Sequence, residues 1–164
     1  MEIISITEKP ELISQVSKYH LETFQQFFLD NHQIKDITEL EILYRKLYLE
    51  ERLGELFILY DLQKLIGFVS LNPDNITNYQ RLKENGIFIT DIYILESYRG
   101  LGYGTFLLKR MIHKLLIMNK SIYVSICKEK LFSYYEKMGF EKVDSVLLNQ
   151  KKYLIYEFVD YVKY

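Results

Sequence analysis

The residues best suited to chemistry form a glycine-rich turn in the second half of the chain. Arg99, Gly100, Gly102 and Gly104 follow a run of strand-forming residues and precede a helical pattern. A turn of this kind directs successive backbone N–H groups at one point, and the helix start adds unpaired N–H donors and a positive dipole end. Such a cradle binds phosphate through the main chain. The sequence therefore predicts a phosphate-binding turn over residues 99–104.

Two familiar phosphate-binding patterns do not fit this turn. A P-loop requires a lysine followed by serine or threonine after its last glycine, and no glycine of the turn supplies that pair. A dinucleotide fingerprint would need a third glycine where Thr105 or Leu107 stands. The acidic residue expected about 20 positions further on is also missing. A nucleotide-phosphate-binding protein of another fold therefore remains only a third hypothesis.

A third pattern, Arg-x-x-Gly-x-Gly, fits at Arg99, Gly102 and Gly104. It resembles the acyl-CoA pyrophosphate loop of the GNAT superfamily of N-acetyltransferases. The longer block 92–104 and a second block at 132–140 are similar to the two core blocks of that family. The hairpin around 64–68 is also typical of it. The resemblance implies an acyl-CoA-dependent N-acetyltransferase with acetyl-CoA as cosubstrate and no metal.

The resemblance also implies which residues hold acetyl-CoA. A bulge in the preceding strand would free the backbone of Ile92 and Ile94 for the pantetheine arm, with one N–H acting as an oxyanion donor. Arg99 would supply a fixed cation, or alternatively a surface ion pair with Glu96. The implied cofactor-binding set is Ile92, Tyr93, Ile94, Arg99, Gly100, Leu101, Gly102, Tyr103, Gly104 and Thr105.

Tyr135 matches the family's general acid. Acetyl transfer from a thioester to an amine expels a thiolate, and a tyrosine hydroxyl beside the sulfur can donate the proton. The alternative role is a packed aromatic residue on a short helix. Tyr134 is the second candidate for the acid, one position out of register.

The general base is harder to find. The strand glutamate of many family members falls at Phe88, which cannot accept a proton. Asp91 is the only carboxylate within that strand, and it would face the cleft if the strand is bulged or solvent if it is not. Glu84 and Glu55 are more distant candidates. An asparagine common before the second motif helix is replaced by Lys128, which removes one expected CoA contact.

The patterns around these residues predict a single α/β domain spanning 1–164. The chain of 164 residues is 49% hydrophobic and 26% charged, which indicates a globular protein. The resemblance implies a mixed, mostly antiparallel twisted sheet of about six to seven strands flanked by about four helices. Strands are expected near 2–7, 55–60, 65–71, 87–95, 121–126, 140–148 and 152–159. Helices are expected near 12–29, 37–53, 79–83, from the turn to 118, and at 129–138.

Smaller expectations accompany this layout. Gly54 and Gly139 should end helices, and Met118 should lie on a buried helical stripe. The last strand is apolar on both faces, so it is either inserted in the sheet or covered by a partner, and a homodimer is compatible with the second option. Cys127 is expected to be a small core residue rather than a nucleophile.

Composition excludes several partners. The net charge of −1 gives no basic excess for nucleic acid, and no segment predicts a signal peptide or a membrane span, so a cytoplasmic protein is expected. The acceptor is expected to be a small-molecule amine or polyamine rather than a protein. The competing hypothesis is a catalytically silent acyl-CoA-binding or regulatory module, which the missing strand glutamate favours.

Overall fold

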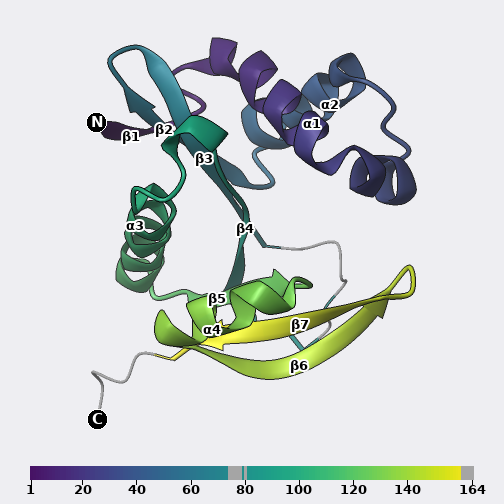
Figure 1. The fold of residues 1–164 in the computed structure, drawn as a ribbon, viewed down its shortest axis with the longest axis vertical. Helices are drawn as coiled ribbons and strands as arrows, with labels where there is room; N and C mark the ends of the chain where they lie inside the picture. Colours follow the sequence, from purple (N-terminus) through teal and green to yellow (C-terminus); the bar gives the residue numbers. More distant parts are fainter. Residues whose placement is uncertain (74–78, 80, 160–164) are drawn as a thin grey trace. The chain divides into compact units, whose positions relative to one another are not determined.

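A computed structural model describes residues 1–73, 79 and 81–159. Its sheet has seven strands in the order β1-β2-β3-β4-β5-β7-β6 within the described part of the chain. The strands are β1 (Glu2–Ser5), β2 (Glu55–Asp61), β3 (Lys64–Asn72), β4 (Gly86–Ile94), β5 (Ser121–Ile126), β6 (Phe140–Leu148) and β7 (Lys151–Phe158). The helices are α1 (Ile13–His32), α2 (Ile37–Tyr44), α3 (Tyr103–Ile117) and α4 (Phe132–Lys137). This confirms the predicted mixed sheet with four flanking helices (Figure 1).

The chain folds as two compact units that share β4 and α3. The first unit comprises Met1–Leu71 and Asp91–Lys109, and the second comprises Asn72–Thr90 and Arg110–Tyr164. A single domain over residues 1–164 stays a prediction.

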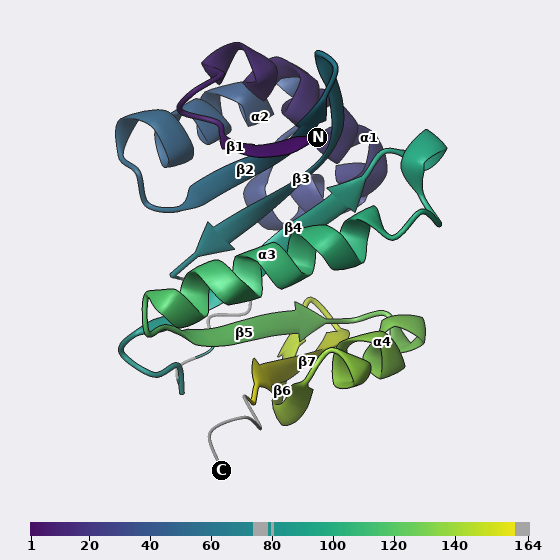
Figure 2. The same ribbon diagram turned by 90° about the vertical axis from the view of Figure 1, so that its left-hand side faces the viewer.

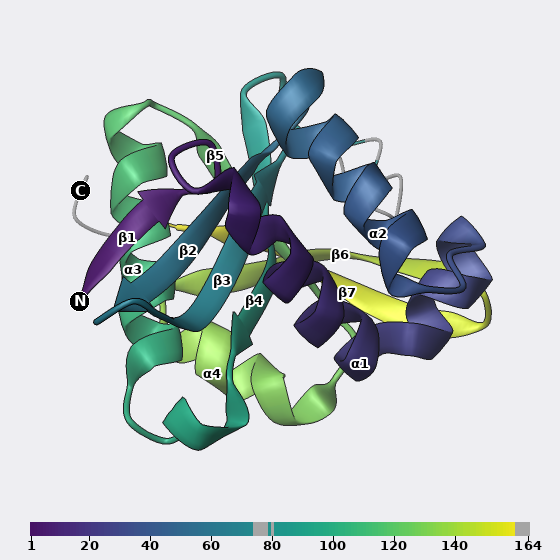
Figure 3. The same ribbon diagram turned by 90° about the horizontal axis from the view of Figure 1, so that it is seen from above.

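The core of the first unit lies between helices α1 and α2 and the strands β1, β2 and β3. Apolar residues at helical spacing in α1, such as Val16, pack with alternating strand residues such as Ile58 and Phe68. All three are fully buried. Figures 1 and 3 show α1 and α2 together over these strands.

The two N-terminal helices end differently from the prediction. The polar segment 30–32 is still helical, and α1 ends where Gln33 takes a left-handed φ of 57°. The second helix changes to a π-helical turn at Arg45–Glu50, where the N–H of Glu51 donates to the carbonyl of Lys46. The left-handed residue after it is Arg52, not Gly54, so the predicted glycine cap is wrong. Because the π-helical turn is wider than an α-helical turn, the helix ends earlier than predicted. The left-handed position therefore falls at Arg52, two residues before Gly54.

The β2–β3 hairpin has a shorter loop than expected. Only Leu62 and Gln63 separate the strands, with φ values of 44° and 65°. Positive φ at both positions is the mark of a two-residue type I′ turn, which matches the twist of the flanking strands.

In the second unit, β7 is inserted between β5 and β6, as the apolar character of both its faces suggested (Figure 2). Gly139 ends the motif helix with a φ of 92°, also as expected. Three expectations are wrong. Residues 79 and 81–83 form no helix, although residue 80 and residues 74–78 lie outside the described part. Met118 is 46% exposed because α3 ends one residue earlier, and Cys127 lies half-buried just beyond β5.

Gly67 is required for the close approach of β3 and β4 near the site. A Cβ there would lie 2.4 Å from the carbonyl oxygen of Tyr93 and 2.6 Å from Cδ1 of Ile94. Because backbone would have to move, we expect Gly67→Ala to lower the free energy of unfolding by about 1–3 kcal/mol, measured by urea denaturation. Gly104→Ala is the control, since its Cβ would meet only Cγ1 of Ile94 at 3.7 Å. Equal stability of the two variants would contradict this interpretation.

Candidate active site

The predicted turn has the geometry of an anion-binding loop. Gly100 and Gly102 have φ values of 77° and 83°, a conformation that favours glycine. No heavy atom of the described chain lies within 4 Å of a Cβ built at either position. The first α-helical hydrogen bond of α3 runs from the N–H of Phe106 to the carbonyl of Gly102 at 2.9 Å. The N–H groups of Tyr103 and Gly104 therefore precede the helical hydrogen-bond ladder, as a pyrophosphate site requires.

Arg99 is fixed at the entrance of this turn. Its Nε donates to the carbonyl of Ile94 at 2.8 Å, and its guanidinium lies 5.4 Å from the ring centroid of Tyr93. Arg99 makes these contacts instead of the alternative ion pair with Glu96. No such ion pair is present among the described residues. The side chain stays exposed, so its charge is available to a bound phosphate.

The strand that leads into the turn is bulged at Asp91. This residue has a φ of 52° within β4, and positive φ in a non-glycine strand residue marks a local irregularity of the bulge type. Ile92, Tyr93 and Ile94 follow the bulge and are half-buried. The backbone that the resemblance assigns to the pantetheine arm therefore follows directly after the irregularity, as expected.

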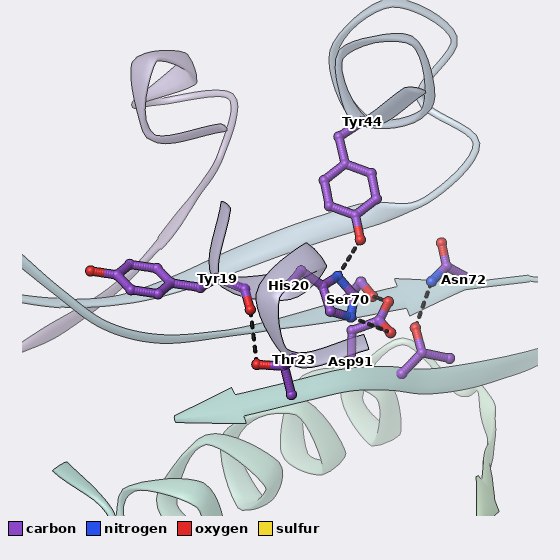
Figure 4. Close-up of polar contacts among 8 residues, drawn as sticks. Tyr19, His20, Thr23, Tyr44, Ser70, Asn72 and Asp91 are labelled. Carbon is purple, nitrogen blue, oxygen red and sulfur yellow. Dashed lines mark hydrogen bonds and ion pairs between the residues drawn. The ribbon is translucent and has the colours of Figure 1, made fainter. Parts of the chain in front are cut away.

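The bulge brings Asp91 to two polar partners from other elements (Figure 4). Ser70 on β3 donates its hydroxyl proton to Oδ2 of Asp91 at 2.6 Å. Nε2 of His20 on α1 lies 3.3 Å from Oδ1 of the same carboxylate. The other ring nitrogen of His20, Nδ1, is hydrogen-bonded to the hydroxyl of Tyr44 on α2. The Asp91 side chain is still 34% exposed, so the carboxylate can also meet a substrate.

The sequence did not indicate His20, Tyr44 or Ser70 as site residues. All three are buried, at positions whose periodicity predicts only that they face the core. The one feature of the sequence that could have indicated this site is His20, a histidine within the apolar stripe of a helix. Phe88, at the position of the family's glutamate, is buried in the second unit and offers no base.

Tyr135 lies on α4 in an aromatic setting. Its ring packs edge-to-face against Phe140 and Tyr134, with centroid distances of 5.7 Å and 5.2 Å. Burial, with a smaller contribution from Tyr134, raises the pKa of Tyr135 to about 12. Its hydroxyl therefore keeps its proton at neutral pH, as a general acid must. Tyr135 belongs to the second unit, whereas Asp91 and the turn belong to the first.

The family model of the acetyltransferase (GNAT) family matches residues 16–140, more than half of the 164-residue chain. The chain belongs to the GNAT family. The match includes the glycine turn, Asp91 and Tyr135. No curated protein matches the sequence at a significant level.

Solved structures of other GNAT proteins share this fold. A spermidine N-acetyltransferase chimera from Vibrio cholerae and hSSAT matches with a TM-score of 0.72 and 20% identity, over 96% of this chain and 95% of that chain. An aminoglycoside 6′-N-acetyltransferase complexed with coenzyme A gives a TM-score of 0.70 and 15% identity, over 96% of each chain. An Elizabethkingia anophelis GNAT protein with acetyl-CoA bound gives 0.55 and 18%, over 79% of this chain and 86% of that chain.

None of the helices in the described part of the chain is both long and apolar enough to cross a bilayer. Among the same residues, no group of three or more His, Cys, Asp or Glu side chains could hold a metal ion.

Proposed function

We propose that this GNAT protein transfers an acetyl group from acetyl-CoA to a primary amine of a small molecule by direct attack. The observation that carries the proposal is the turn at the start of α3, where two left-handed glycines come before the N–H groups of Tyr103 and Gly104, which precede the first helical hydrogen bond. Structures of other family members contain coenzyme A or acetyl-CoA, which supports the same donor here.

The residues of the turn suit a pyrophosphate. The N–H groups at residues 100–105 would donate to its oxygens, and Arg99 would add a positive charge that its contact with Ile94 holds in place. The N–H of Ile92 or Ile94 would polarise the thioester carbonyl. Acetyl-CoA supplies the activated acyl group.

The proposed protein roles balance the protons of the reaction. Asp91 accepts a proton from the substrate ammonium, which leaves a neutral amine whose lone pair forms the new C–N bond. The C–S bond breaks, and the departing thiolate takes the hydroxyl proton of Tyr135. The nitrogen releases its extra proton to solvent, from which Tyr135 is reprotonated. Asp91 returns the ammonium proton to solvent, so one proton is released per turnover.

A small cationic amine is the acceptor we favour. The exposed part of the Asp91 carboxylate can attract an ammonium group. The named acceptors of two structural neighbours, spermidine and aminoglycosides, are amines of this kind. A cytoplasmic location and a homodimer stay predictions.

We expect Asp91→Asn to lower kcat/KM for the amine by about 10²- to 10⁴-fold, because the amide cannot accept the ammonium proton. The Kd for acetyl-CoA should stay within about twofold. Steady-state thiol release and calorimetry measure the two quantities. Glu84→Gln, which neutralises a more distant candidate base, is the control and should retain activity. If Glu84→Gln lowered kcat/KM more than Asp91→Asn does, Asp91 would not be the general base.

The experiment that tests the proposed activity is thiol release from acetyl-CoA across spermidine, kanamycin and a lysine-containing peptide. We expect turnover with spermidine or kanamycin. Acetyl-CoA binding without thiol release on any amine would instead select the catalytically silent module.

A further inference from the structure

We infer that His20 is a positioning residue that orients the carboxylate of Asp91 for the incoming amine. The inference rests on the proposed role of Asp91. It is carried by the juxtaposition of His20, Tyr44, Ser70 and Asp91, which come from α1, α2, β3 and β4 (Figure 4).

The imidazole of His20 is held rigidly. The residue is only 3% exposed. Aromatic rings surround it, with centroid distances of 5.2 Å to Phe24, 5.0 Å to Phe28 and 5.4 Å to Phe68. A ring packed in this way has one orientation, so its two nitrogens point in fixed directions.

Tyr44 determines which ring nitrogen of His20 carries the proton. Burial raises the pKa of the Tyr44 hydroxyl well above its ordinary value, so this hydroxyl remains protonated. It can therefore donate to Nδ1 of His20, which places the ring proton on Nε2. Nε2 faces Oδ1 of Asp91 at 3.3 Å, so the donors run in one direction from Tyr44 through His20 to the carboxylate.

Asp91 is thereby contacted at both oxygens. Ser70 donates to Oδ2, and the N–H of His20 faces Oδ1. The backbone of Asp91 has the left-handed φ that side-chain-bearing residues rarely adopt, so contacts from the surrounding elements must hold it there. The consequence is one fixed orientation of the carboxylate, whose exposed part meets the substrate.

Two variants of His20 separate positioning from packing. His20→Phe keeps an aromatic ring among its neighbours but removes both ring nitrogens. We expect it to lower kcat/KM for the amine by about 10- to 100-fold and to leave the Kd for acetyl-CoA within about twofold. His20→Gln can accept from Tyr44 with its carbonyl and donate to Asp91 with its amide, so it should recover most of the loss. His113→Phe makes the same change at an exposed histidine of α3 and is the control.

The tautomer of His20 can be measured by NMR in the protein without substrate, so this test does not depend on catalytic turnover. In protein labelled with ¹⁵N-histidine, the His20 resonances are those missing from His20→Phe among the 3 histidines of the chain. We expect the Nε2–H tautomer, and an increased share of the other tautomer in Tyr44→Phe. Failure of the wild type to acetylate any amine would refute the proposed function, while this spectrum would still decide the arrangement around His20.

Three results would overturn the inference. They are an Nδ1–H tautomer in the wild type, unchanged kcat/KM in His20→Phe, and a larger loss of kcat/KM in His20→Gln than in His20→Phe when both variants unfold at the wild-type temperature. The last result would show that the packed ring, and not its nitrogens, is what His20 contributes.

Discussion

Replacing Tyr135 with phenylalanine should lower kcat by about 100-fold or more, while the Kd for acetyl-CoA stays within about twofold. General acid catalysis contributes about 10²- to 10⁴-fold, and phenylalanine keeps the ring contacts with Phe140 while removing the proton. Thiol release at saturating amine measures kcat, and calorimetry measures Kd. Because burial raises the pKa of Tyr135 to about 12, the acid stays protonated from pH 7 to 10 and should cause no alkaline loss of kcat in that range.

Tyr134→Phe is the matched control for this prediction. Tyr134 neighbours Tyr135 in α4 and packs against its ring, but it is one position out of register with the family's acid. We expect its kcat to stay near the wild-type value. Weakened acetyl-CoA binding in Tyr135→Phe with unchanged kcat would assign Tyr135 a structural role instead.

The double variant Gly100→Ala, Gly102→Ala should weaken acetyl-CoA binding by about 30- to 900-fold. A left-handed conformation costs a residue with a Cβ about 1–2 kcal/mol. The exposed alanine turn is therefore expected to relax in the free protein, and restoring it on binding costs about 2–4 kcal/mol if the two effects add. Both glycines have positive φ, with open space around an added Cβ, so the loss would come from backbone conformation rather than a clash. Calorimetry with acetyl-CoA measures the change in Kd.

Gly104→Ala provides the matched comparison. It adds the same methyl group in the first turn of α3, where the structure has no positive φ and only an ordinary contact with Ile94. Its Kd should stay within a few-fold of the wild-type value. Equal losses in the single-site and double variants would mean that the added methyl groups, and not the turn conformation, control binding.

The sequence predicted the parts of the site that depend on local chain geometry. Gly100 and Gly102 stand where a strand turns into a helix, and glycine is the residue that takes positive φ without strain, so the turn follows from residue type and spacing. Gly139 follows the end of α4 for the same reason, since it also takes a positive φ. The position of Tyr135 within a recognisable block indicates its role as the acid, and that role stays a prediction.

The surroundings of Asp91 depend instead on tertiary structure. Ser70 precedes it by 21 residues and Tyr44 follows His20 by 24, and periodicity indicates only that such residues face inward. The resemblance implied a bulge in this strand, but it did not place the left-handed φ at Asp91 or the contacts of its carboxylate with Ser70 and His20. No residue type in the sequence indicates the π-helical turn after α2. The sequence therefore predicted that the helix ends at Gly54, whereas the left-handed residue that follows it is Arg52.

Calorimetric titration of the wild-type protein with acetyl-CoA tests most directly whether the turn at Arg99–Gly104 binds an acyl-CoA. We expect saturable binding with one acetyl-CoA per chain, unaffected by an excess of ATP or NAD. Absence of acetyl-CoA binding by folded protein, or displacement of acetyl-CoA by ATP or NAD, would contradict the assignment of the turn at Arg99–Gly104 to an acyl-CoA pyrophosphate.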